Sequence, residues 1–65
     1  MDIEVGKSYQ SRNFPNITRR VIAVNYHGIV TYRSEDSAKA KPLFKRLLRM
    51  VDSEFVKCSI GVALS

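Results

Sequence analysis

The fold is decided by residues 19–33, which read RRVIAVNYHGIVTYR. Two runs rich in β-branched residues, 19–24 and 29–33, are separated by the short segment 25–28, which ends in glycine. β-Branched runs are typical of strands, and glycine readily supplies the positive φ that a tight connection between two strands needs. This stretch therefore predicts a β-hairpin in which Gly28 has a positive φ.

Alternation along the two strands predicts what each face of the hairpin carries, because successive side chains point to opposite sides. One face is expected to be apolar and to contribute to the core, and its members are Ile22, Val24, Val30 and Tyr32. The other face is expected to be basic, with Arg33 next to either Arg19 or Arg20.

The length of the chain bounds what the hairpin belongs to. With 65 residues, the sequence has the size of one small domain that spans 1–65. That is too short for a Rossmann fold or a TIM barrel. Hydrophobic residues make up 45% and charged residues 26%, which is typical of a globular chain and not of a disordered one.

The segments on either side of the hairpin have simpler patterns. Residues 1–11 hold several spaced apolar side chains and predict a short strand. Residues 12–18 predict a loop, because Pro15 and two asparagines favour turns. Residues 34–41 are polar and predict a second loop.

Residues 42–57 allow two interpretations. Their apolar positions fall on one arc at about 100° per residue, which predicts a helix over 42–57 that starts at Pro42, with or without a break near residue 52. A polar residue after the break, Asp52 or Ser53, would then cap a short final helix. The alternative is a strand over 43–50 that leads into a short helix, although the apolar residues there do not alternate.

The C-terminal segment 58–65 is apolar, with Ile60, Val62 and Leu64. We expect it to add an edge strand to the chain's own sheet, or else to pack across a symmetric dimer. The protein is thus expected to be a monomer or a homodimer. Taken together, the patterns predict an α+β fold, a small antiparallel sheet of three to four strands with one C-terminal helix.

The spacing of several residues also points to a known class of protein. The residues concerned are Val5-Gly6-x-x-Tyr9, Arg20-Val21-Ile22-x-Val24 and Gly28-x-Val30-x-Tyr32-Arg33, followed by an apolar and basic segment that reaches Phe55. This arrangement, over about residues 4–57, resembles small phage and prophage proteins of unknown function. The resemblance implies a short β-rich domain similar to an SH3-like half-barrel, a cytoplasmic location and an origin in a mobile element or its bacterial host. It implies no catalytic residue.

Positive charge is the main functional signal in the sequence. Eleven lysines and arginines stand against six acids, so the net charge is +5 at pH 7. No acid interrupts 37–51, and basic residues on one side of a helix suit the phosphates of nucleic acid. The candidate nucleic-acid-binding residues are Arg19, Arg20, Arg33, Lys45, Arg46 and Arg49. The alternative is that they form only a solvated surface.

Aromatic residues close to these arginines in the sequence add a second hypothesis, that unpaired bases stack on exposed rings. The candidates are Tyr9, Phe14, Tyr26 and Tyr32. For Tyr9 and Tyr32 the alternative is a place in the core, because so small a domain has few large apolar side chains to bury.

Catalytic chemistry is not indicated. His27 lies in the predicted turn without a residue to orient it as a base, and Cys58 is the only cysteine. We therefore expect no enzyme activity, no cofactor and no metal. The single cysteine, the acidic N-terminus and the lack of a long apolar run predict a cytoplasmic protein that does not enter a membrane.

The leading functional hypothesis is non-enzymatic binding of nucleic acid, either DNA or RNA. The alternative is a small interaction factor that binds and modulates a host protein, through the hairpin tip or through residues 60–64.

Overall fold

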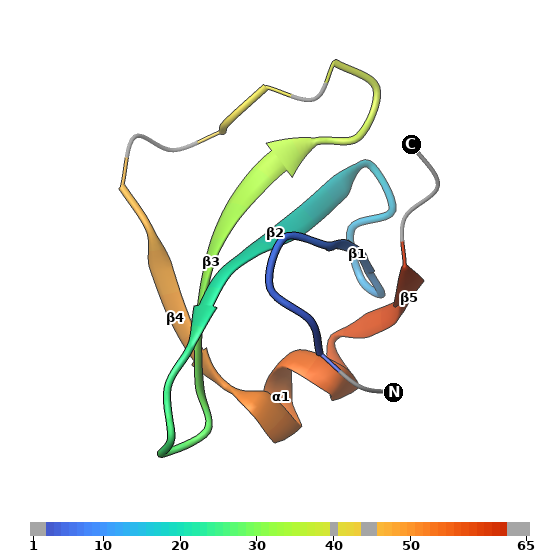
Figure 1. Cartoon of the computed structure of the whole chain (residues 1–65). Coiled ribbons are helices and arrows are strands. Elements are labelled where there is room, and N and C mark those ends of the chain that lie inside the picture. The colour runs from blue at the N-terminus through green and yellow to red at the C-terminus, as the bar shows by residue number, and fades with distance from the viewer. Residues whose placement is uncertain (1–2, 40, 44–45, 63–65) are drawn as a thin grey trace.

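The computed structural model describes residues 3–39, 41–43 and 46–62. These form one antiparallel sheet with the strand order β4-β3-β2-β1-β5 and a single short helix that connects β4 to β5 (Figure 1). The elements are β1 (Ser8–Ser11), β2 (Ile17–Val24), β3 (Ile29–Asp36), β4 (Leu48–Val51), α1 (Asp52–Lys57) and β5 (Ser59–Val62). The fold is broadly α+β, as predicted. It has five strands where three or four were expected, and α1 has only six residues.

The predicted hairpin is confirmed. β2 pairs with β3, and Gly28 in the connection has a φ of 80°. The turn is closed by a hydrogen bond from the Gly28 amide to the Asn25 carbonyl, at 3.0 Å. The Asn25 side-chain oxygen also accepts bonds from the amides of His27 and Ile29, at 2.9 and 3.0 Å. Asparagine and glycine therefore fix this turn, each through its own local chemistry.

The predicted apolar face of the hairpin is correct on β3 and wrong in part on β2. Val21 lies opposite Tyr32, whereas the next pair is Ala23 with Thr31, so Ile22 is an extra residue in β2. Such a bulge shifts the alternation of side chains by one position. Val21 consequently takes the buried place expected for Ile22, which is only half-buried. Val24 lies opposite Val30 but is 39% exposed.

The core lies between the curled sheet and α1. Its buried members are Tyr9, Val21, Val30, Tyr32 and Phe55, with Ile3, Leu48 and Met50 packed against them. The Phe55 ring stands edge-on to the rings of Tyr9 and Tyr32, with both centroid distances at 5.6 Å. The helix is thus held by one aromatic side chain that contacts two strands.

The helix predicted over residues 42–57 is wrong for every described residue before Asp52, because 42, 43, 46 and 47 are not helical and Leu48–Val51 form β4. Leu48 lies opposite Tyr32 and Met50 opposite Val30, so pairing with β3 places both on the core face. A free edge of a growing sheet can override local helix periodicity, because it satisfies the backbone hydrogen bonds of an added strand. The alternative, a strand that leads into a short helix, is therefore the better description of the described part.

The expected capping of α1 by a polar side chain is also wrong. Val51 occupies the N-cap position and makes no side-chain cap hydrogen bond, although the Asp52 carboxylate accepts a bond from the Ser53 amide at 2.7 Å. Asp52 is instead the first helical residue, and its amide donates a 2.8 Å hydrogen bond to the Gly28 carbonyl. This bond ties the start of α1 to the hairpin turn.

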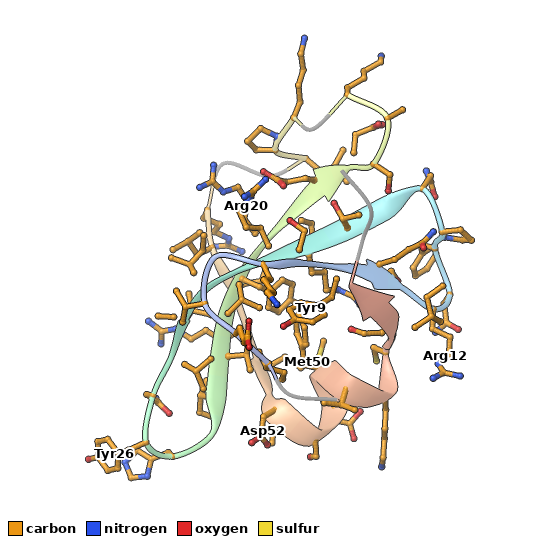
Figure 2. The ribbon with its side chains drawn as sticks, turned by 45° about the vertical axis from the view of Figure 1, so that its right-hand side comes forward. Tyr9, Arg12, Arg20, Tyr26, Met50 and Asp52 are labelled. Atoms are coloured by element: carbon orange, nitrogen blue, oxygen red, sulfur yellow. The ribbon has the colours of Figure 1, made fainter. Side chains whose placement is uncertain are left out.

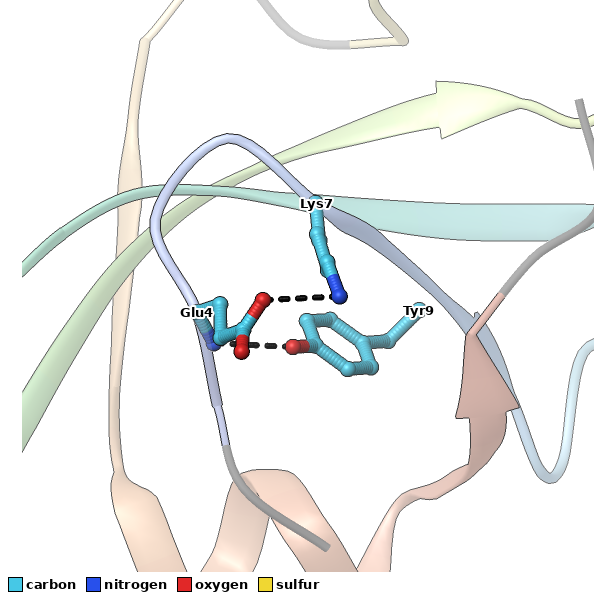
Figure 3. Close-up of polar contacts among 3 residues, drawn as sticks. All are labelled: Glu4, Lys7 and Tyr9. Atoms are coloured by element: carbon cyan, nitrogen blue, oxygen red, sulfur yellow. Dashed lines mark hydrogen bonds and ion pairs between the residues drawn. The ribbon is translucent and has the colours of Figure 1, made fainter.

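Two predicted loops are shorter than expected. β2 already begins at Ile17, and β3 continues to Asp36, so that Ser34 and Glu35 are buried strand residues. The N-terminal segment contributes to the fold as well (Figure 3). The Glu4 amide donates to the Tyr9 hydroxyl at 2.8 Å, and the side chains of Glu4 and Lys7 form an ion pair at 2.7 Å.

The C-terminal segment forms an edge strand on the chain's own sheet, as favoured. β5 pairs with β1 in an antiparallel register that aligns Tyr9 with Val62 and Ser11 with Ser59. Ile60 remains 55% exposed, and Leu64 lies outside the described residues. Within the described ranges, no helix has the length and apolar character needed to cross a membrane.

Candidate nucleic-acid interface

Arg19 and Arg20 lie on opposite faces of β2. Arg19 is aligned with the buried Ser34, on the face that carries the core, whereas Arg20 is aligned with Arg33 on the other face. We call the face with Arg20 and Arg33 the outer face. Figure 2 shows Arg20 well away from Tyr9 and Met50, which lie between the sheet and α1.

Three of the candidate arginines come together on the outer face. Arg20 and Arg33 are direct cross-strand neighbours, and Arg49 on β4 lies opposite Thr31, two residues from Arg33. Such diagonal neighbours are about 7–8 Å apart, within reach of long side chains. Arg20, Arg33 and Arg49, hereafter the arginine row, therefore cross three adjacent strands.

One carboxylate lies within this row. The Glu35 side chain is 7% exposed, and it accepts a hydrogen bond from the Arg20 Nε at 3.1 Å. Because burial of an unpaired carboxylate is costly, this bond explains how the outer face accommodates Glu35. The sequence did not point to this pair, since residues 34–41 read as a loop.

The other two arginines of the row have no such partner. Among the residues that the structure describes, neither Arg33 nor Arg49 forms an ion pair. The Nε of half-buried Arg33 is enclosed and has no hydrogen-bond partner there. A buried donor without an acceptor costs about 1–3 kcal/mol. The enclosed Nε is not open to a ligand, so a contact between Arg33 and an anion would use the terminal nitrogens of its guanidinium.

Arg19 is engaged elsewhere. Its guanidinium donates to the Cys58 carbonyl at 3.1 Å and lies over the Tyr32 ring, 5.8 Å from the ring centre. Arg12 donates to the carbonyls of Lys57 and Ser59, at 2.9 and 3.4 Å. Positive side chains at the end of a helix satisfy carbonyls that have no partner within it. The structure thus places Arg19 apart from Arg20 and Arg33.

The basic residues expected along one side of a helix do not lie on a helix in the described part of the chain. Arg49 belongs to β4, and Arg46 is exposed in the segment before that strand. Lys45 lies outside the described residues. Arg49 nevertheless reaches the arginine row, because β4 pairs with β3.

Lys7 is close to Arg20 in the sheet but does not add a free charge. It directly precedes Ser8, which is aligned with Arg20. The hydrogen bond and the negative charge of Glu4 raise the pKa of Lys7 above its ordinary value. Its ammonium group is therefore directed to Glu4, as Figure 3 shows.

The four aromatic candidates divide into two groups. Tyr9 and Tyr32 are buried core residues, in agreement with the alternative considered for them. Phe14 is 55% exposed in the β1–β2 connection, and Tyr26 is 92% exposed at the hairpin tip. The Tyr26 and His27 rings lie against each other, with centroids 4.0 Å apart and planes tilted by 38°.

Reactive groups are not gathered into a site within the described ranges. No cluster of three or more histidine, cysteine or acidic residues there is able to hold a metal ion. Cys58 is a half-buried free thiol, and His27 is exposed in the turn. The arginine row is therefore the arrangement with the clearest chemical use.

Comparison with known proteins finds no matching family model, no similar curated protein and no similar solved structure. The assignment of a function consequently rests on the geometry of the outer face.

Proposed function

We propose that this protein is a non-enzymatic module that binds nucleic acid through phosphate contacts from the outer face of its sheet. The arginine row supplies these contacts, together with Arg46, which is exposed in the segment before β4. The observation that carries the proposal is that Arg20, Arg33 and Arg49 lie on one face of three adjacent strands, two of them without an ion pair among the described residues.

Guanidinium groups suit this task because each presents several donors in a plane that matches a phosphate. Contact with a polyanion also releases its condensed counterions, which makes binding favourable at low salt. A net charge of +5 increases the rate of encounter with such a ligand.

The arrangement of the strands supports a finer description. We infer that the sheet is a partly open, SH3-like barrel, because β5 pairs with β1 and the short helix lies between β4 and β5. The corresponding proposal for origin and location is a cytoplasmic protein of phage or mobile-element type, in line with the resemblance of residues 4–57.

A protein partner is the second candidate. Two exposed apolar side chains favour it. Tyr26 lies at the hairpin tip and Ile60 in residues 60–64, and these are the two segments expected to form such a contact. A pull-down from bacterial lysate with and without nuclease separates the two. Loss of the captured material after nuclease supports nucleic acid, and protein capture that survives nuclease supports the alternative.

The direct test is the salt dependence of oligonucleotide binding. Replacement of Arg33 and Arg49 by Gln should reduce the slope of log affinity against log salt by about 1.4 to 1.8, since two phosphate contacts are lost. Fluorescence anisotropy with a labelled oligonucleotide at several salt concentrations measures this slope.

A matched control removes one exposed positive charge from α1. The Lys57→Gln variant should leave the slope unchanged, because Lys57 pairs with Glu54 on the helix, away from the outer face. Arg20 is left in place because its loss would strand the buried Glu35 carboxylate. Absence of binding by the wild-type protein at low salt would refute the proposal.

A further inference from the structure

The hairpin tip exposes an aromatic ring that the fold does not use. Tyr26 is 92% exposed, although burial of an aromatic side chain is one of the largest favourable contributions available to so small a domain. Its only ring neighbour among the described residues is His27. Figure 2 shows Tyr26 at the far end of the hairpin, remote from Tyr9 in the core.

The tip is held by several bonds. Its amides donate to the side-chain and main-chain oxygens of Asn25, and the Gly28 carbonyl accepts from the Asp52 amide at the start of α1. The Asp52 carboxylate lies against Gly28, where a Cβ atom would meet it at 3.2 Å. A platform with a fixed backbone loses little conformational entropy when a ligand binds.

The tip and two members of the arginine row, Arg20 and Arg33, belong to the same hairpin, and Arg49 lies on the adjacent strand β4. Ile29 begins β3, Thr31 lies opposite Arg49, and Arg33 follows two residues later. Successive steps of two residues measure about 7 Å along a strand. The outer-face positions between the tip and the row are uncharged, namely Ala23, Ile29, Thr31 and Val51.

We infer that the nucleic acid bound by the outer face is single-stranded, with one base stacked on Tyr26 while the arginine row contacts phosphates further along the strand. This inference rests on the proposed function and names its substrate class. Bases in a duplex are stacked on each other, whereas an unpaired base offers a free face to an aromatic ring. Such stacking is independent of sequence, because every base has that face.

The test compares a single strand of about 12 nucleotides, oligodeoxythymidine, with a duplex of the same length. Tyr26→Ala should weaken binding to the single strand about tenfold, since stacking of one base on an aromatic ring has this order of effect. The slope of affinity against salt should not change, because no phosphate contact is lost. Duplex binding should also stay the same.

Two control variants separate stacking from other effects. Tyr26→Phe retains the ring and should bind the single strand as the wild type does. Phe14→Ala removes an exposed ring from the β1–β2 connection, at the other end of β2 from the tip, and should leave the affinity unchanged.

Tyrosine fluorescence gives a second measurement. The chain has three tyrosines and no tryptophan, and Tyr9 and Tyr32 are buried. Addition of the single strand should therefore quench mainly the emission of Tyr26. The Tyr26→Phe variant should bind without this quenching.

The outcomes separate the two proposals. No binding of either oligonucleotide by the wild type at low salt overturns both. Salt-dependent binding that Tyr26→Ala leaves unchanged, or weakens equally for single strand and duplex, overturns the single-strand inference alone. The single-strand inference is also overturned if Tyr26→Ala abolishes capture of a protein from nuclease-treated lysate but leaves oligonucleotide binding intact.

Discussion

Arg19 and Arg20 are adjacent in the chain, yet the two faces of the sheet give them different surroundings. On the core face, Arg19 donates to the Cys58 carbonyl and lies over an aromatic ring. On the outer face, Arg20 pairs with Glu35 beside two arginines that have no ion pair among the described residues. A cluster of positive charges in the sequence therefore combines residues that stabilise the fold with residues whose guanidinium groups have no acidic partner among the described residues.

The core face can be disrupted by one substitution. Phe55→Ala removes the ring that joins α1 to Tyr9 and Tyr32, and should cost about 3–5 kcal/mol of unfolding free energy. A domain of this size has few kcal/mol to lose, so we expect the variant to be largely unfolded.

Thermal unfolding followed by circular dichroism measures the Phe55 effect, and Phe14→Ala is the matched control for an exposed ring. A cooperative transition for Phe55→Ala at the wild-type temperature would contradict the assignment of Phe55 to the core.

The adjacent arginines provide a finer test of the comparison. Arg19→Gln should lower the unfolding free energy by about 1–2 kcal/mol, because it removes a charged donor from the Cys58 carbonyl. Its salt slope of oligonucleotide binding should equal that of the wild type. Arg49→Gln should do the reverse, with unchanged stability and a reduced slope.

Urea unfolding measures the stability of both variants, and anisotropy titrations measure their salt slopes. If Arg19→Gln also reduced the salt slope while its stability stayed unchanged, the division of the arginines between two faces would be wrong.

The smallest effect is expected for Lys7, the residue that precedes β1 and pairs with Glu4. Because Glu4 raises the pKa of the folded Lys7, its charged form stabilises the fold below its ordinary pKa, and this contribution disappears as the pH rises through the folded value. Wild type should therefore lose slightly more stability at strongly alkaline pH than Glu4→Gln does. Unfolding curves at neutral and alkaline pH for both proteins measure the difference, and parallel losses would contradict the pairing.

Features with local causes were predictable from the sequence. The β2–β3 hairpin follows from β-branched runs around a turn that ends in Gly28, and alternation correctly predicted that Arg33 shares a face with one of two arginines. The bulge at Ile22 was not predictable, because an extra strand residue leaves no mark in composition. Its position decides which of Val21 and Ile22 is buried.

Features that depend on distant pairing were not predictable in the same way. The apolar residues of 48–51 fit a helical arc, and only the edge of β3 selects a strand there. The same pairing brings Arg49 to the arginine row. Helical periodicity groups Arg49 with Lys45 and Arg46, so the sequence pattern identifies the residue but not its neighbours in the sheet.

The pairing of β5 with β1 has a consequence for the order in which the molecule folds. Neighbouring strands such as β2 and β3 meet after closure of a short turn, which takes microseconds. β1 and β5 meet only after nearly the whole described chain has been brought round, since Ser11 pairs with Ser59. Such long-range closure carries an entropic cost before any contact rewards it, and slows folding toward milliseconds or longer. The bonds from Arg12 and Arg19 to the carbonyls around Cys58 should then form late, in the step that completes the sheet.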